Sequence, residues 1–166
     1  MRNAVTVYRF FSRQGKFVQM KRIYVREEVC IGCRLCEVYC QRQHSQSKDL
    51  IKAFKRELPR PLPRLRMEEK GPVSFTVRCQ HCDDAPCVNA CLTGAITREP
   101  ESGRINVDED RCIGCWTCVL VCPLGAIRRD THHGMIAKCH LCQGEDMPVC
   151  VANCPNEALI YAEASI

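Results

Sequence analysis

The arrangement of cysteine constrains this chain more than any other feature of its sequence. Sixteen of the 166 residues are cysteine, and they form four groups of four. Each group begins with Cys-x2-Cys and ends with Cys-x3-Cys, so one device recurs along the chain. The groups are Cys30, Cys33, Cys36 and Cys40; Cys79, Cys82, Cys87 and Cys91; Cys112, Cys115, Cys118 and Cys122; and Cys139, Cys142, Cys150 and Cys154. No cysteine is left over, which indicates that all sixteen serve the same kind of site.

The rest of the composition indicates which chemistry the cysteines serve. Dense cysteine is common in secreted, disulfide-linked domains. Residues 1–21 do not resemble an export signal, because Arg, Lys or Gln interrupts every apolar run. No run of about 18 apolar residues could span a bilayer. We therefore expect no membrane span and a cytoplasmic location, where clustered cysteines bind metal more often than they form disulfides.

The spacing within the groups predicts the metal. Groups one and three read Cys-x2-Cys-x2-Cys-x3-Cys, the run that binds [4Fe–4S] clusters in bacterial ferredoxins. Three cysteines on a tight loop can face one cube, while the fourth lies a helical turn further on and binds the neighbouring cluster. The proline that usually follows the run is present as Pro123 and Pro155, but Gln41 and Leu92 replace it in groups one and two. Taken together, the groups predict four clusters with crossed ligation.

Three other interpretations compete with this one. A zinc-stabilised interaction module is a distant alternative, because zinc sites join two separated Cys-x2-Cys pairs rather than adding a third and a fourth cysteine at these spacings. Disulfides are weaker still, since cysteines three apart cannot pair without strain. A redox or iron sensor is the other alternative, and one or two exposed clusters would serve it better than four.

The charge of the chain argues against a role in nucleic-acid binding. The formal charge is +5. Four oxidised clusters at about −2 each would bring the loaded protein to about −3. Part of the Lys and Arg surplus therefore compensates the clusters. Aromatic residues make up only 6% of the chain and do not alternate with basic ones, so no nucleic-acid partner is expected.

Short strand-like segments lie between the cysteine groups and limit how the groups can pair. A turn near 101–103 makes a hairpin between groups two and three, and a similar hairpin joins groups three and four. Three pairings of four groups are possible. We favour pairing two with three, because the segments 22–29 and 157–163 can then pair as first and last strands around groups one and four. The hairpin after group three is nearly as short, so its pairing with group four stays open.

These features predict an α+β fold made of two nested dicluster modules like those of bacterial ferredoxins, with short antiparallel strands and short helices around cubane clusters. The expected division is an N-terminal extension (1–21), an outer module (22–40 plus 132–166), a basic, Pro-containing insertion (41–72) and an inner module (73–131). We expect residues 1–19 to be dispensable for cluster binding. The insertion holds nine Lys or Arg against four acidic residues over 41–70, which suggests a docking segment that uses Arg60, Arg64 and Arg66.

Three segments resemble a known family. They are "RCQHCDDAPCVNACLTGAI", "RCIGCWTCVLVCPLGAI" and "KCHLC" with "CVANCPNEAL". They resemble the four-cluster ferredoxin-like electron-transfer subunits of DMSO-reductase-type molybdoenzymes, formate-linked hydrogenases and CO dehydrogenases. The resemblance covers residues 22–163, and the stretch "CRLCEVYCQRQHSQSKDLIKAFK" is most similar to the CO-dehydrogenase-associated subunit.

The resemblance implies a ligand set for each of four [4Fe–4S] clusters. Set one is Cys30, Cys33, Cys36 and Cys154; set two is Cys40, Cys139, Cys142 and Cys150; set three is Cys79, Cys82, Cys87 and Cys122; set four is Cys91, Cys112, Cys115 and Cys118. With sixteen cysteines for sixteen irons, we expect His81 and His140 to donate a hydrogen bond to a cluster sulfide or to be exposed, rather than to be iron ligands.

The resemblance also implies a function. It implies a subunit that is not itself an enzyme and that relays electrons between a catalytic oxidoreductase and a second redox protein. The expected catalytic partner is a CO dehydrogenase, and the expected second partner is a hydrogenase or a flavin-dependent NAD(P) oxidoreductase. The alternative is the electron-transfer subunit of a formate dehydrogenase or another molybdoenzyme.

Overall fold

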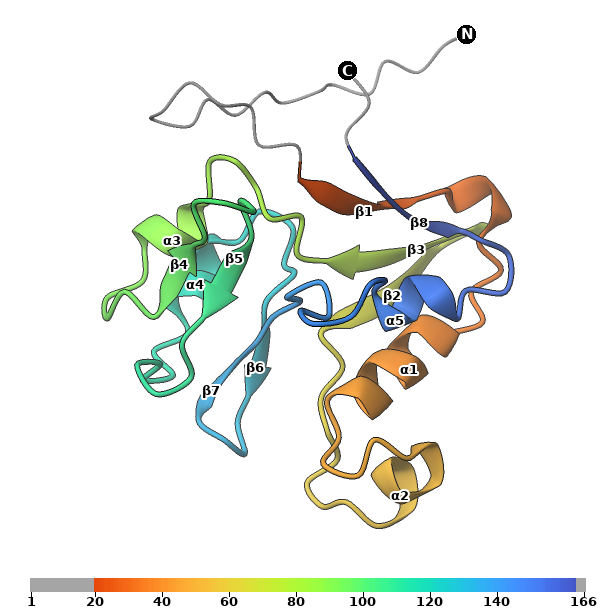
Figure 1. Cartoon of the computed structure of the whole chain (residues 1–166), viewed down its shortest axis with the longest axis horizontal. Coiled ribbons are helices and arrows are strands. Elements are labelled where there is room, and N and C mark those ends of the chain that lie inside the picture. The colour runs from red at the N-terminus through yellow and green to blue at the C-terminus, as the bar shows by residue number, and fades with distance from the viewer. Residues whose placement is uncertain (1–19, 164–166) are drawn as a thin grey trace, which may run out of the picture.

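A computed structural model of the chain describes residues 20–163 (Figure 1). The predicted extension 1–21 lies almost wholly outside the described residues, so the dispensability of 1–19 stays a prediction. Short helices and strands alternate along the chain, which confirms the mixed α+β class. The elements are β1 (Lys21–Val25), η1 (Glu27–Val29), α1 (Leu35–Gln43), α2 (Leu50–Lys55), β2 (Leu65–Lys70), β3 (Val73–Arg78), α3 (Pro86–Asn89), β4 (Ile96–Arg98), β5 (Ile105–Val107), α4 (Thr117–Val121), β6 (Arg128–Asp130), β7 (Met135–Ala137), α5 (Val149–Ala152) and β8 (Leu159–Glu163).

The strands of the described part form four antiparallel pairs. Three of them are hairpins between neighbouring strands: β2 with β3, β4 with β5, and β6 with β7. The fourth joins β1 to β8, the two ends of the described chain, with Ile23 opposite Tyr161. This confirms the predicted pairing of the first strand with the last.

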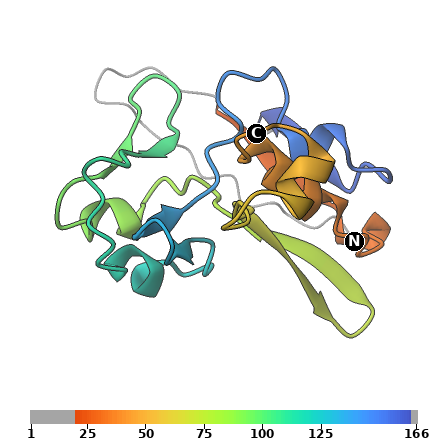
Figure 2. The same cartoon turned by 90° about the horizontal axis from the view of Figure 1, so that it is seen from below.

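Within residues 20–163, buried side chains form two cores. The first core gathers around Ile23, Leu65 and Leu159, and the helices α1 and α5 pack against each other beside it. The second core gathers around Ile96, Ile105 and Ile127, and the helices α3 and α4 pack against each other there. Figures 1 and 2 show the elements of the two cores side by side. Cysteines contribute to both cores, so the fold is built around its thiols.

The segment 41–72 differs from the insertion that the sequence suggested. Its helix α2 is capped by Asp49, whose carboxylate accepts a hydrogen bond from the Lys52 amide at 2.8 Å. Its last part, however, forms β2, which adds Leu65 and Met67 to the first core. The hairpin β2–β3 therefore crosses the expected boundary at 72/73. Only two apolar residues mark β2, too few for the alternation to be visible in the sequence.

The other expected boundary, at 131/132, also falls inside a hairpin. The strands β6 and β7 pair across it, and Ile136 of β7 packs in the second core. The second core thus extends to the end of β7.

Polar contacts tie the two cores together. Arg22 of β1 pairs with Asp83 at 2.7 Å, and both side chains are about one fifth exposed (22% and 19%). Arg66 donates to the Gly125 carbonyl at 2.6 Å, and Arg64 lies 3.7 Å from the Glu109 carboxylate. Arg64 and Arg66 are therefore engaged within the molecule, so these two expected docking arginines have structural contacts of their own.

Candidate metal centres

The loops Cys30–Cys36 and Cys112–Cys118 share one backbone device. In the first, Gly32 and Arg34 have φ of +65° and +59°; in the second, Gly114 and Trp116 have φ of +64° and +62°. Two left-handed residues, separated by one residue, coil the chain so that two cysteines of the loop and a third in the first turn of the following helix can face one side. Glycine is required at 114, because a β-carbon there would overlap the backbone oxygen of Gly134.

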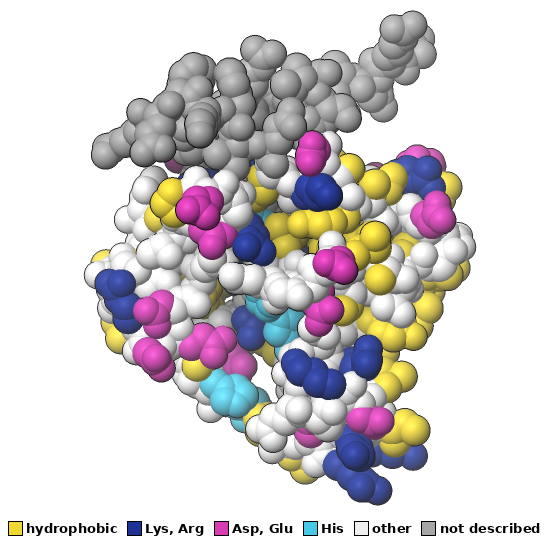
Figure 3. Space-filling view, viewed as in Figure 1, with side chains coloured by type: hydrophobic (Ala, Val, Ile, Leu, Met, Phe, Trp, Pro, Cys, Tyr) yellow, Lys and Arg dark blue, Asp and Glu magenta, His cyan; other side chains and the backbone are white. Residues whose placement is uncertain are grey.

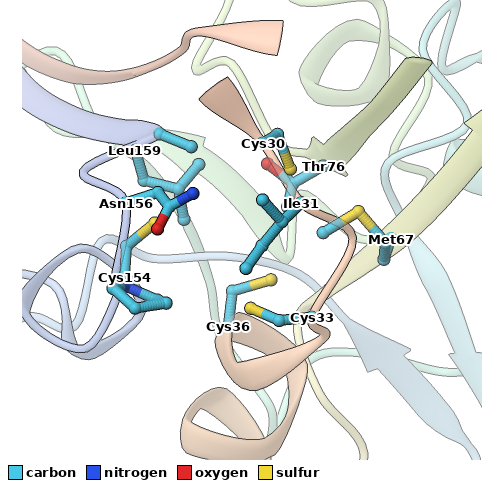
Figure 4. Close-up of a pocket in the computed structure, with 11 residues that line it drawn as sticks. Cys30, Ile31, Cys33, Cys36, Met67, Thr76, Cys154, Asn156 and Leu159 are labelled. Carbon is cyan, nitrogen blue, oxygen red and sulfur yellow. The ribbon is translucent and has the colours of Figure 1, made fainter. Parts of the chain in front are cut away.

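The cysteines of set one surround a common hollow of about 340 Å³. Cys30, Cys33 and Cys36 come from the first loop, and Cys154 follows α5 near the other end of the chain. Figure 4 shows these four side chains around one space, with Met67 and Thr76 of the hairpin β2–β3 at its edge. Helix α1 packs against α5, and this contact brings the two distant segments together.

Two further hollows of similar size are lined in part by residues of the second core. One, of about 310 Å³, is lined by all four cysteines of set four, and Trp116 lies at its wall. The other, of about 330 Å³, is lined by all four cysteines of set three. Each hollow combines three cysteines of one group with a single cysteine of the other, as the crossed arrangement predicts. The packing of α3 against α4 brings the two groups together.

The four cysteines of set two are all buried. The pKa of Cys40 is raised to about 12, chiefly by burial, and the neighbouring Cys139 and Cys142 contribute to this rise. Burial also holds the pKa of Cys150 well above its usual value, with further contributions from Cys139 and Cys40. These mutual effects show that group one and group four meet at this site too. The structure thus places the cysteines of sets one, three and four around common hollows, and set two as the ligands of one cluster stays a prediction.

The chemistry of the donors fits an iron–sulfur cube. Burial raises the pKa of Cys36 to about 12 and that of Cys118 to about 11, so these thiols lose their protons only beside bound cations such as iron. Backbone N–H groups donate to sulfur: that of Arg64 to Cys40 at 3.2 Å, and that of Ala126 to Cys122 at 3.4 Å. Such donors stabilise thiolate and cluster sulfur.

An unpartnered hydroxyl supports the same fit at set one. Thr76 is 5% exposed and lines the hollow of set one. Its hydroxyl oxygen is buried and has no hydrogen-bond partner among residues 20–163. A buried hydroxyl without a partner is costly. A cluster sulfur in the hollow would give this hydroxyl an acceptor.

Exposure differs between the sets in a systematic way. Cys33 of set one and Cys115 of set four are exposed, whereas every cysteine of set two is buried and set three has none exposed. The Thr117 hydroxyl donates to Cys115 at 3.5 Å and lowers its pKa. Ile31 and Ile113, each in the Cys-Ile-Gly-Cys part of its loop, are 64% and 65% exposed. Sets one and four therefore reach the surface, set two is fully buried, and set three, with Cys82 and Cys122 half-buried, is less exposed than sets one and four.

The two histidines in cysteine loops have other partners than iron. His81 is 1% exposed, and its Nδ1 accepts a hydrogen bond from the Ile105 amide of β5 at 2.9 Å. His140 Nε2 lies 3.0 Å from His44 Nε2, and burial lowers the pKa of both rings. Neither histidine is exposed, and these contacts are with a backbone amide and with His44, so the expected hydrogen bond to a cluster sulfide stays a prediction.

The sequence alone does not show that Thr76, Arg78 and Lys138 are buried (2–5% exposed). The one available signal is position, because Arg78 and Lys138 each stand directly before the first cysteine of a group. Among the described residues, no helix has the length and hydrophobicity needed to cross a membrane.

Four sets of four cysteines, with amide donors directed at their sulfur atoms, define an iron–sulfur electron-transfer protein. The chain belongs to the family described as "4Fe-4S dicluster domain", whose model matches residues 73–164. With sixteen cysteines in ferredoxin-like motifs, it has the ligands for four [4Fe–4S] clusters, and these are its cofactors.

Curated relatives agree with this class. The chain is 39% identical over 150 residues to the electron transport protein HydN of Escherichia coli (strain K12). The matched region covers 81% of this chain and 83% of HydN. It is 35% identical to an iron-sulfur protein of Rhodospirillum rubrum, and the match covers 82% of this chain and 79% of that protein. It is 36% identical to the thiosulfate reductase electron transfer subunit PhsB of Salmonella typhi, and the match covers 81% of this chain and 71% of PhsB. These names support the family and leave the expected CO dehydrogenase partner as a proposal.

Proposed function

We propose that the chain is a non-catalytic relay that passes electrons through four [4Fe–4S] clusters, one held by each cysteine set. The meeting of four cysteines from two different groups around each site is the observation that carries this proposal. The clusters supply one-electron chemistry, and the protein supplies spacing, burial and tuning. Since every set has four cysteines, no iron is left open to a substrate, which argues for a relay and against a cluster enzyme.

The relay consists of two modules, one per core. Sets one and two belong to the outer module and sets three and four to the inner module, which is nested within it in sequence. Electrons enter and leave at sets one and four, which are the sets with exposed cysteines (Cys33 and Cys115). Sets two and three carry them between the modules.

The partners are a catalytic oxidoreductase at one end and a second redox protein at the other. On the resemblance of residues 33–55, the catalytic partner is a CO dehydrogenase, and the second partner is a hydrogenase or a flavin-dependent NAD(P) oxidoreductase in the cytoplasm. The second candidate function is service to a formate dehydrogenase or another molybdoenzyme. A relative that is 36% identical is named a thiosulfate reductase electron transfer subunit, which supports service to a catalytic reductase other than CO dehydrogenase.

Iron content and partner-driven reduction test the proposal. Full-length protein purified without oxygen should contain about 16 iron and about 16 sulfide per chain, and its brown absorbance should bleach on reduction. A zinc-loaded, colourless protein would overturn the relay. Reduction should then be followed with CO plus CO dehydrogenase, and in parallel with formate plus formate dehydrogenase. Faster reduction by formate would replace the first partner with the second.

A further inference from the structure

Two basic side chains are buried where the two cores meet. Arg78, the last residue of β3, and Lys138, just after β7, are each 2% exposed. Arginine and lysine are almost never fully buried unless an opposite charge accompanies them. No ion pair found among residues 20–163 includes either one. Their partner must therefore be an anion other than a carboxylate of the described chain.

Arg78 lies close to cysteines of both interior sets. Burial lowers its pKa, and Cys139, Cys150 and Cys79 act in the opposite direction. Cys79 belongs to set three, and the other two belong to set two. The Nε and one terminal nitrogen of the guanidinium are buried without a hydrogen-bond partner in the described part of the chain. Arg78 thus has unused N–H donors and a fixed positive charge between two groups of thiolates.

Lys138 occupies an equivalent place. Its ammonium donates to the carbonyl of Ile105 at 2.5 Å and to that of Cys139 at 2.9 Å, so it bridges the second core and set two. The same charge opposes the pKa rise that burial causes at Cys87 of set three and at Cys139. Like Arg78, it therefore acts on one set from each core.

We propose that Arg78 and Lys138 form a fixed cationic junction that raises the reduction potentials of the clusters in sets two and three. The inference rests on the proposed relay. A cluster gains one negative charge on reduction, so a buried cation beside it stabilises the reduced form. An electron crossing the junction oxidises one site as it reduces the next, and no proton has to move. Because each cation acts on both sets, it stabilises the reduced form of the set two cluster as well as that of the set three cluster.

Arg111 provides a matched control. It also stands directly before the first cysteine of a group, Cys112. Unlike Arg78, it is exposed, and its guanidinium donates to the Thr93 carbonyl at 2.6 Å. The same substitution at the two positions therefore removes a basic residue at the same place in the motif, buried in one case and solvated in the other.

The test is a redox titration of the full chain, loaded with its clusters and monitored by electron paramagnetic resonance. Arg78→Met and Lys138→Met should keep the iron content of the unmodified protein. In each, at a fixed potential, the ratio of reduced to oxidised interior clusters should fall at least tenfold, which is 59 mV for a one-electron couple. The shift should persist at 1 M salt, because buried charges are little screened. Arg111→Met should shift no potential.

Unchanged potentials in variants with full iron content would overturn the junction, as would an equal shift in Arg111→Met. If Arg78→Met loses iron, Arg78→Gln decides, because it removes the charge and keeps a hydrogen-bonding side chain. Loss of iron in every neutral variant, with retention in Arg78→Lys, would show a role in assembly and overturn the tuning role. If the unmodified protein itself lacks iron–sulfur clusters, the proposed function fails instead, which separates the two outcomes.

Discussion

The contact of Gly114 with the turn of the hairpin β6–β7 allows a quantitative prediction about set four. Gly114 has φ of +64°, and an added β-carbon would overlap the backbone oxygen of Gly134. The left-handed backbone costs a residue with a side chain about 1–2 kcal/mol. Backbone must also move to relieve the overlap, and overpacking of this kind typically adds about 1–3 kcal/mol to the cost. We therefore expect Gly114→Ala to destabilise the loaded protein by about 2–5 kcal/mol.

Gly71 separates the two contributions. It lies in the turn between β2 and β3 with φ of +60°, and an added β-carbon would meet nothing within 4 Å. Gly71→Ala should therefore show only the backbone cost of about 1–2 kcal/mol. The difference between the variants is the cost of the overlap.

The assay is the rate at which the iron–sulfur absorbance bleaches in a fixed concentration of urea without oxygen. An extra 1–3 kcal/mol in the loaded state corresponds to bleaching roughly fivefold to a hundredfold faster in Gly114→Ala than in Gly71→Ala. The first iron lost should be that of set four, so the content should fall from about 16 to about 12 per chain. Equal bleaching rates in the two variants would refute the reasoning.

Three further predictions concern ligation, docking and the chain start. Cys40→Ser should alter the spectrum of the set two cluster and leave that of set one unchanged; the reverse pattern would contradict crossed ligation. Lys and Arg side chains gather around α2 (Figure 3), so reversing the charge of the exposed Lys52 and Lys55 should slow electron transfer with one partner, most at low salt, while the distant Lys70→Glu should not. Deleting residues 1–19 should leave the iron content unchanged, and a loss of iron would show that the extension is needed.

The cysteine groups and the closing strand pair could be predicted because both depend on local patterns. Spacing fixes which cysteines can share a loop, and strand-like segments at both ends of the described chain have only each other to pair with if the inner hairpins are already paired. The strand β2 could not be predicted. Its inward face consists of Leu65 and Met67, and its other residues are charged, so its pairing with β3 is a tertiary effect.

The burial of Arg78 and Lys138 could not be predicted for a different reason. Hydrophobic patterns assign long basic residues to the surface, and that rule holds for Arg111, which has the same position in its motif. What reverses it at Arg78 and Lys138 is the meeting of thiolates from two distant groups. The sequence predicts that part of the basic surplus compensates the clusters, but it does not show which basic residues lie where sets two and three come together.

The exposure of the four sets explains why a relay of this design needs cations at its centre. Adding negative charge costs more in a buried site than in a solvated one, so burial by itself makes the clusters of sets two and three harder to reduce than those of sets one and four. An electron entering at Cys33 or Cys115 would then meet an uphill step in the middle of the molecule. A fixed charge on Arg78 and on Lys138 offsets that step where the modules meet.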